Sequence, residues 1–331
     1  MASASIATGV SVLLTGATGF VGRNLRPALV EHGHRVRCMT RAPEQARQRD
    51  SSAEWVSADV SKPETLRPAM EGCVVAFYLV HSMGESQAGF RERELLAAHT
   101  FAEAAADAGL QRIVYLGGVA PEVSPSEHLR SRLAVGRTLR EGRVPAIELR
   151  ASMIVGYGSL SWLIVRDLAA RLPFMVLPRW LNSLTQPVGI GDVVAALVGA
   201  LDVPLDGGQW YDIPGPEALS GKEILVRTAR QIGLACPVMV TVPVLSPWLS
   251  SHWVHFVTRA QWEIAREIVV GLSDNLLAQD DGYWQQIGHV QRQLFDQAAH
   301  QALAEEARHA PVGGAWGAVE RMLKRIRAAG R

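Results

Sequence analysis

Residues 10–22 of the chain read Val-Ser-Val-Leu-Leu-Thr-Gly-Ala-Thr-Gly-Phe-Val-Gly. An apolar, β-branched run leads into a turn in which Gly16 permits a tight bend, Gly19 lets the backbone approach a pyrophosphate and Gly22 lets a helix pack closely on the sheet. A helix that begins here points its free N–H groups at the phosphates. The stretch therefore predicts a dinucleotide-binding turn between a strand and a helix, with cofactor contacts from Gly16, Thr18, Gly19, Phe20, Val21 and Gly22.

Outward from this turn, β-rich runs alternate with helical patterns. Strands are expected at 35–40, 55–57, 74–80, 112–116 and 146–150, and helices at 22–31, 63–70, 90–108 and 127–141. This rhythm predicts an α/β fold with a Rossmann-type, doubly wound parallel sheet. After residue 150 the rhythm weakens, which predicts a smaller, mainly helical C-terminal lobe. We expect residues 1–155 to form the core, completed by 185–215, while 156–184 and 216–331 form the substrate lobe.

The end of the second strand indicates which dinucleotide is bound. NAD-specific sites usually place an acidic residue there to bind the ribose hydroxyls, whereas residues 38–41 read Cys-Met-Thr-Arg. Arg41 can pair with a 2′-phosphate, and Thr40 can add a hydroxyl donor. The expected cofactor is NADP(H), the alternative being that Arg41 is an exposed loop arginine without a ligand.

Two further strand ends predict cofactor contacts. Asp59 and Val60, after the third strand, would flank the adenine, although a strand-end Asp also commonly caps a turn. Leu79, Val80 and His81, after the fourth strand, would line the path toward the nicotinamide. A plain loop histidine is an equal reading of His81.

Composition narrows the class of protein. With 33 Lys and Arg against 32 Asp and Glu, the net charge is +1, which speaks against nucleic acid as a partner. The three cysteines, Cys38, Cys73 and Cys236, form no Cys-x-x-Cys pair, so neither a disulfide framework nor a zinc site is indicated and a reducing cytoplasm is the expected location. Residues 231–258 lack charged Asp, Glu, Lys and Arg side chains, but prolines interrupt them, so no membrane span is expected and peripheral contact stays open.

The chain resembles the short-chain dehydrogenase/reductase superfamily in its atypical extended branch. The matching residues are 15–22, 40–41, 59–60, 115–118 and 150–156. Residues 172–180 and 185–193 resemble a subgroup of bacterial NAD(P)H-binding proteins that are similar to NAD-dependent epimerases and dehydratases. The resemblance covers about residues 10–275 and implies a Rossmann fold and a nicotinamide cofactor, with Ala151 among its contacts.

The departures from the superfamily pattern concern catalysis. Dehydrogenases of this superfamily carry a Ser after the fifth strand and a Tyr-x-x-x-Lys on the next helix, and these positions fall on Gly118, His128 and Arg132. Arg132 can hold ribose hydroxyls but cannot be deprotonated. His128 can move a proton near neutral pH. The catalytic residues would be His128 and Arg132, unless the two are merely a solvated pair on a helix face.

Aromatic residues are frequent after residue 160. Those at 162, 174, 180, 248 and 253, with Met175, suggest an apolar site for a large substrate, although for any single one of them plain core packing is the favoured reading. His252 and His255 have no acidic or cysteine neighbour, so no metal site is expected. Two functions remain: an oxidoreductase or isomerase acting on an apolar small molecule, or a non-catalytic NADP(H)-binding redox sensor or structural subunit. The oligomeric state is left open.

Overall fold

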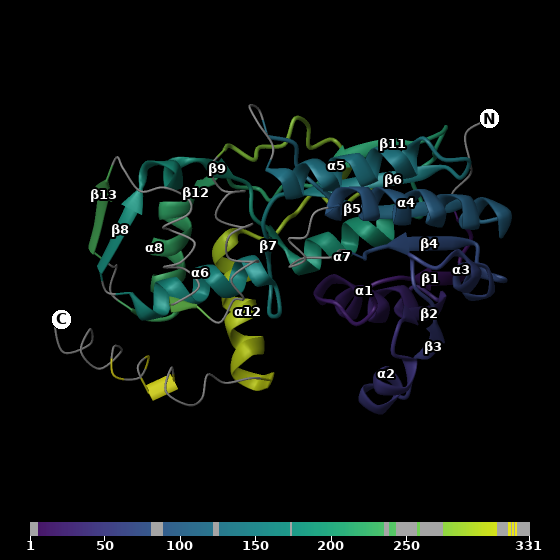
Figure 1. Cartoon of the computed structure of the whole chain (residues 1–331). Helices are drawn as coiled ribbons and strands as arrows, with labels where there is room; N and C mark the ends of the chain where they lie inside the picture. Colours follow the sequence, from purple (N-terminus) through teal and green to yellow (C-terminus); the bar gives the residue numbers. More distant parts are fainter. Residues whose placement is uncertain are drawn as a thin grey trace.

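The computed structural model describes residues 6–80, 89–121, 126–172, 174–234, 238–242, 257–258, 274–309, 317–318, 320 and 322. Its main feature is a sheet of seven parallel strands (Figure 1). The strands are β1 (Ser11–Leu14), β2 (Arg35–Thr40), β3 (Glu54–Ser57), β4 (Val75–Tyr78), β5 (Arg112–Gly118), β6 (Ala146–Ala151) and β11 (Gln209–Asp212). Their order in the sheet is β11-β6-β5-β4-β1-β2-β3. Starting from β1, the chain adds β2 and β3 on one side and the later strands on the other, which confirms the predicted doubly wound Rossmann-type fold.

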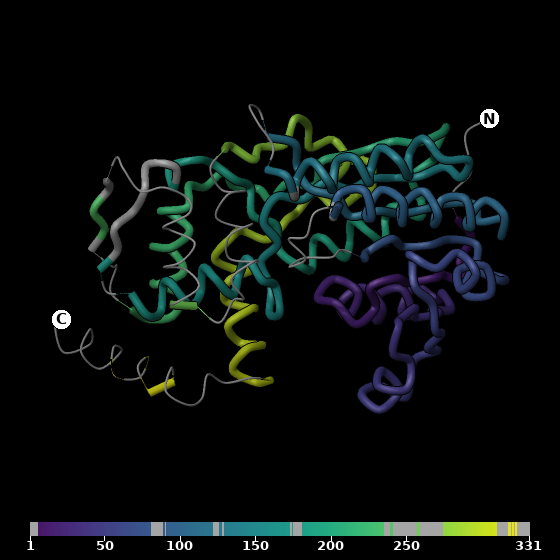
Figure 2. Tube along the Cα trace, in the orientation of Figure 1, coloured from purple at the N-terminus to yellow at the C-terminus, as the bar shows by residue number. Residues whose placement is uncertain are grey.

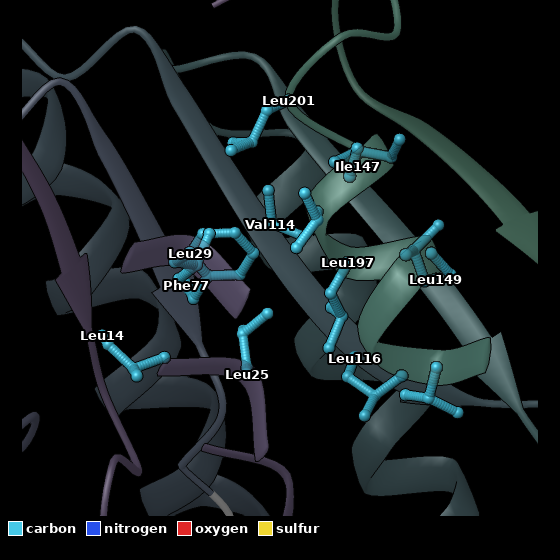
Figure 3. Close-up of a cluster of buried hydrophobic side chains, with 14 of the residues drawn as sticks. Leu14, Leu25, Leu29, Phe77, Val114, Leu116, Ile147, Leu149, Leu197 and Leu201 are labelled. Carbon is cyan, nitrogen blue, oxygen red and sulfur yellow. The ribbon is translucent and has the colours of Figure 1, made fainter. Parts of the chain in front are cut away.

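Helices cover both faces of this sheet. On one face, α1 (Phe20–Glu31) and α7 (Ile190–Gly199) pack on a cluster of buried side chains (Figure 3). On the other face, α3 (Pro63–Met70), α4 (Phe90–Asp107) and α5 (Glu127–Arg140) enclose a second cluster. The short helix α2 (Pro43–Arg49) precedes β3. All four residues of β4 are buried, as expected for a strand covered on both faces.

The C-terminal lobe lies beyond the carboxyl ends of the strands, at the left of Figures 1 and 2. Its helices α6 (Leu160–Arg171), α8 (Gly221–Gln231) and α12 (Phe295–His309) pack together, and α8 begins with a capping box between Ser220 and Glu223. The small strand pairs are β7 (Ile154–Val155) with β10 (Val188–Gly189), β9 (Leu184–Thr185) with β12 (Leu219–Ser220), and β8 (Phe174–Pro178) with β13 (Val238–Val242), and a 3-10 turn spans Arg179–Asn182.

A late segment of the chain returns from the lobe to the main sheet. It contains α11 (Tyr283–Gln286), and both Tyr283 and Trp284 are fully buried against the first cluster. The Tyr283 hydroxyl donates to the carbonyl of Ala196 at 2.7 Å, and the Trp284 indole donates to the carbonyl of Pro214 at 3.1 Å. Residues distant in sequence thus complete the packing around α7 and the end of β11.

Candidate functional site

The glycine turn leads from β1 into α1, and two of its glycines are required by the chain itself. Gly16 has φ +62°, and a Cβ there would stand 2.5 Å from the carbonyl oxygen of Leu79. A Cβ on Gly22 would stand 2.3 Å from the carbonyl oxygen of Gly16. These distances are shorter than any contact a Cβ makes in a folded protein, so both positions exclude a side chain.

Gly19 differs, because the protein leaves room beside it. Its φ of −76° suits any residue, and among the described residues its added Cβ would meet only the carbonyl oxygen of Gly16, at 3.1 Å. Gly19 is also the N-cap of α1, and no side chain in the part of the chain that the structure describes caps the helix. The first N–H groups of α1 are therefore available to an anion. This cradle fits the diphosphate of a dinucleotide, with Thr18 exposed and Phe20 and Val21 partly buried around it.

Thr15 fixes the neighbouring strand end against this turn. Its buried hydroxyl donates to the carbonyl of Phe77 and accepts from the N–H of Leu79, both at 2.9 Å. Leu79, just after β4, thus lies beside the turn, and Val80 follows it. His81 lies outside the described residues.

The ends of β2 and β3 lie next to each other, because these strands pair in parallel. Burial tends to raise the pKa of Asp59, but hydrogen bonds from Ser61 and the positive charges of Arg41 and Lys62 leave that pKa below its ordinary value. The Asp59 carboxylate accepts from the N–H and the hydroxyl of Ser61, so it closes a local turn. Arg41 is exposed beside it, and Val60 packs partly into the second cluster.

The start of α5 meets the end of β5. Ser126 caps the helix by accepting from the N–H of Leu129 at 3.2 Å. Arg132 donates from Nη2 to the carbonyl of Leu116 at 2.7 Å, and the Tyr115 hydroxyl donates to the backbone carbonyl of Arg132 at 3.1 Å. Burial raises the pKa of Tyr115 to about 12, so its hydroxyl keeps its proton.

The structure brings Gly118 and Arg132 together at this point. A Cβ on Gly118 would stand 3.7 Å from Arg132 Nε and 2.7 Å from a methyl carbon of Leu129. Gly118 also pairs with Ala151 of β6, so the predicted contact from Ala151 lies on the adjacent strand end. His128 lies in the first turn of α5, but its side chain is outside the described residues.

Sequence reasoning missed a buried ionic group under α5. Glu148 on β6 is fully buried and binds Arg140 at 2.9 Å and Arg150 at 3.0 and 3.2 Å. The guanidinium of Arg150 also lies 4.1 Å from the centre of the Trp210 ring. A Cβ on Gly136 would stand 2.4 Å from the Glu148 carboxylate, so this glycine lets α5 sit over it. The sequence signal that could have revealed this group is the alternation of charged and apolar residues in β6, which is otherwise apolar.

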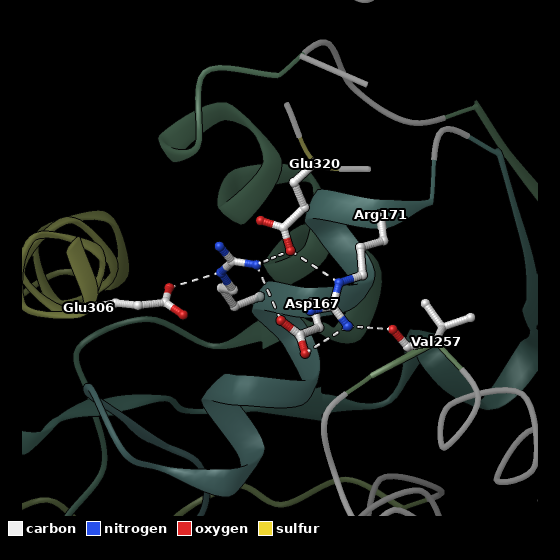
Figure 4. Close-up of polar contacts among 6 residues, drawn as sticks. Asp167, Arg171, Val257, Glu306 and Glu320 are labelled. Atoms are coloured by element: carbon white, nitrogen blue, oxygen red, sulfur yellow. Dashed lines mark hydrogen bonds and ion pairs between the residues drawn. The ribbon is translucent and has the colours of Figure 1, made fainter. Parts of the chain in front are cut away.

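A second buried ionic group joins the helices of the lobe (Figure 4). Arg166 binds Glu306 at 2.9 Å, Glu320 at 2.6 Å and Asp167 at 3.2 Å. Arg171 binds Asp167 at 3.1 Å and Glu320 at 3.0 Å. Burial tends to raise the pKa of Glu320, but the bonds and charges of the two arginines hold that pKa below its ordinary value.

The predicted aromatic site is described only in part. Trp162 is buried and contacts Phe295 edge-on, with ring centres 6.3 Å apart, which is core packing. Phe174 is 52% exposed on β8. The side chains of Met175 and Trp180, and the whole of Trp248 and Trp253, lie outside the described part of the chain, as do His252 and His255. Across that part, no helix is long and apolar enough to cross a membrane, and no three metal-binding side chains gather.

Comparison with known proteins gives a family match for the first half of the chain. Residues 16–169 match the NAD(P)H-binding family. The ceramide reductase of Caulobacter vibrioides is 33% identical over 202 residues, which are 59% of this chain and 62% of that protein. The match thus spans less than two thirds of that relative.

Two further matches extend the comparison. The (4-alkanoyl-5-oxo-2,5-dihydrofuran-3-yl)methyl phosphate reductase of Streptomyces griseus is 28% identical over 232 residues, covering 67% of this chain and 74% of that protein. The crystal structure of the Citrobacter sp. triphenylmethane reductase complexed with NADP(H) aligns with a TM-score of 0.68 at 18% identity, over 88% of this chain and 99% of that one. At this identity the structural likeness speaks for the fold.

Proposed function

We propose that the chain, whose residues 16–169 match the NAD(P)H-binding family, is an atypical member of the short-chain dehydrogenase/reductase superfamily and an NADP(H)-dependent reductase of an apolar small molecule. The observation that carries the proposal is the open cradle at Gly19. This cradle follows β1, which lies two strands away from β5 in the sheet, and Arg132 lies beside Gly118 at the end of β5. A cofactor whose diphosphate lies on α1 can extend its nicotinamide along the strand ends toward that arginine.

The residues around the cradle would hold the cofactor by position. Gly16, Thr18, Gly19 and Gly22 would leave the first turn of α1 open to the diphosphate, with Phe20 and Val21 at its edge. Asp59 and Val60 would flank the adenine, while Leu79, Val80, His81 and Ala151 would line the path of the nicotinamide. Thr40 and Arg41 would bind a 2′-phosphate. When bound, reduced nicotinamide supplies a hydride.

The chain's own residues would supply binding and proton transfer. The guanidinium of Arg132 offers donors for the ribose hydroxyls of the cofactor. His128, one turn earlier on α5, would deliver or take a proton near neutral pH. A chain without the superfamily's Ser and Tyr is thus a reductase of an unusual kind.

The substrate class draws support from the relatives. One is named for ceramide and another for a phosphate ester with an alkanoyl group, and both substrates carry apolar chains. A substrate of that kind fits a lobe rich in aromatic residues.

Cofactor preference is tested by titrating NADPH and NADH against the parent, Arg41→Ala and the control Arg49→Ala, whose arginine is also exposed. We expect the parent to prefer NADPH by roughly 10-fold or more, the scale of one charge-assisted contact screened by salt. Arg41→Ala should lose most of this preference and Arg49→Ala none. Equal affinity of the parent for both cofactors would contradict the proposal.

Turnover separates this function from a second one, a non-catalytic NADP(H)-binding sensor or structural subunit. The observation that favours the second function is glycine at position 118, where dehydrogenases carry serine. With an apolar carbonyl substrate, NADPH oxidation should be measurable, and His128→Phe should slow it about 100-fold, the usual scale of general acid catalysis. An unchanged rate would remove His128 from the reaction, and cofactor binding without any turnover across such carbonyl compounds would favour the sensor.

A further inference from the structure

Arg132 keeps one hydrogen-bond donor unused at the end of β5. Its Nη2 donates to the carbonyl of Leu116. Its Nε, in contrast, is buried and has no acceptor among the described residues. A buried donor without a partner costs free energy, so native structures keep such groups where a ligand or a special role provides compensation.

The unused Nε lies close to the place where the superfamily pattern puts a serine side chain. A Cβ on Gly118 would stand 3.7 Å from this nitrogen. The same Cβ would stand 2.7 Å from a methyl carbon of Leu129, so Leu129 fills the room of the missing side chain. A serine hydroxyl and the guanidinium N–H are both hydrogen-bond donors. The site therefore lacks the serine donor but has another donor, Arg132 Nε, beside the serine position.

The orientation of Arg132 is fixed from two sides. The carbonyl of Leu116 holds the guanidinium, and the Tyr115 hydroxyl holds the backbone of the same residue on α5. Fixed donors stabilise charge that develops during a reaction, because they need no reorganisation at that moment. Arginine keeps its proton at every pH at which a protein is folded, so it can bind a negative oxygen but cannot protonate it.

Resting on the reductase function above, we propose that Arg132 Nε donates to the substrate oxygen that becomes negative during reduction of an apolar carbonyl compound. Rotation of the Leu129 side chain opens Nε to that oxygen. The reduction adds a hydride from the reduced nicotinamide to the carbonyl carbon, and the C=O electron pair moves to the oxygen. A proton from His128 completes the alcohol, while Arg132 contributes only its hydrogen bond.

The test uses 4-nitrophenol, whose phenolate imitates the negative oxygen and whose absorbance reports its ionisation. Bound to the parent, the phenol should have its pKa lowered by about 1 to 3 units, as expected for an ionisable group beside an opposite charge. Arg132→Met should abolish this shift, and Arg132→Lys should keep part of it. Arg137→Met, which removes an exposed arginine from the same helix, should behave like the parent.

Titration of the same variants with NADPH distinguishes the two proposals. If Arg132 served the ribose alone, Arg132→Met would weaken NADPH binding and leave the phenol's pKa at the parent value, which overturns the donor role and spares the reductase. Failure of the parent to bind 4-nitrophenol, or to shift its pKa, also overturns the donor role. A parent that shifts the phenol but binds no NADPH would instead overturn the proposed function.

Discussion

At the scale of single residues, the three glycines of the turn are required for different reasons. Gly16 and Gly22 exclude a side chain because protein backbone lies within 2.5 Å of the added Cβ. Gly19 excludes a side chain only if a ligand is present, since the described residues make a single close contact there. Folding thus requires Gly16 and Gly22, whereas binding of the cofactor would require Gly19.

We predict that Gly19→Val weakens NADPH binding at least 10-fold while the thermal midpoint changes little, because its backbone conformation suits any residue. Gly22→Ala is the matched comparison, and it should lower the midpoint itself. Cofactor fluorescence and circular dichroism measure the two effects. If Gly19→Val binds NADPH like the parent while folded, the diphosphate lies elsewhere.

What could be predicted at this scale was local. The Gly16–Gly22 turn follows from its own spacing, because the strand before it and the helix after it are adjacent in the chain. Leu129 could not be predicted as the residue that fills the serine position, since that depends on how α5 sits on β5. For Asp59, the sequence allowed either a contact with the adenine or a cap on a turn. The hydrogen bond from Ser61 that closes this turn could be seen only in the structure.

At the scale of elements, α5 rests on an ionic group supplied by β6. Glu148 has two arginine partners and no exposure, and Gly136 gives it the necessary room. Removing one member of a buried ion pair leaves the other charged and unpaired, which usually costs about 3–5 kcal/mol. The helix that carries Arg132 therefore depends on a carboxylate below it.

We predict that Glu148→Gln lowers the free energy of unfolding by about 3 kcal/mol or more, because Arg150 keeps its buried charge. Urea denaturation checks this. Arg143→Ala is the control, since its bridges to Glu103 and Asp107 are exposed and its midpoint should match the parent. A midpoint for Glu148→Gln equal to that of Arg143→Ala would refute the role of Glu148.

Element types followed from periodicity, but this ionic group did not. Residues 146–150 are mostly apolar, so a strand was expected there, and β6 occupies 146–151. The pattern gives no distance between Glu148 and Arg140, which lie on different elements. Such pairs depend on tertiary packing and need coordinates.

At the scale of the whole molecule, Glu320 connects a late part of the chain to α6. Its carboxylate accepts from both Arg166 and Arg171, which hold its pKa below the ordinary value against the effect of burial. The unfolded chain then takes up this proton at a higher pH than the folded one. Stability from this contact is present above the unfolded pKa and is lost as pH falls through the folded pKa.

We predict that, as the pH falls below about 4.5, the ordinary pKa of this carboxyl, the parent loses stability more steeply than Glu320→Gln, which is already weaker at pH 7. Urea midpoints at a series of pH values measure this, with the exposed Glu31→Gln as a control that should follow the parent. Parallel pH profiles for the parent and Glu320→Gln would exclude the contact as a source of acid sensitivity.

The overall fold was the part most open to prediction, because alternating strands and helices specify a doubly wound sheet with few alternatives. The order of β11 beside β6, and the return of Tyr283 and Trp284 to the core, were not foreseeable. Both features join segments that are separated by many residues in the chain, and the local sequence pattern does not indicate which distant segment each one packs against.

Those two aromatic residues have a consequence for the order of assembly. During synthesis, the cofactor turn leaves the ribosome early, whereas Tyr283 and Trp284 emerge 87 and 70 residues after the carbonyls they bind. Until then, the nascent chain exposes the apolar surface around α7 that they cover. Contacts this remote slow folding and leave intermediates prone to aggregation. The stretch that matches the NAD(P)H-binding family, residues 16–169, therefore ends before α7 and before the two aromatic residues that cover it.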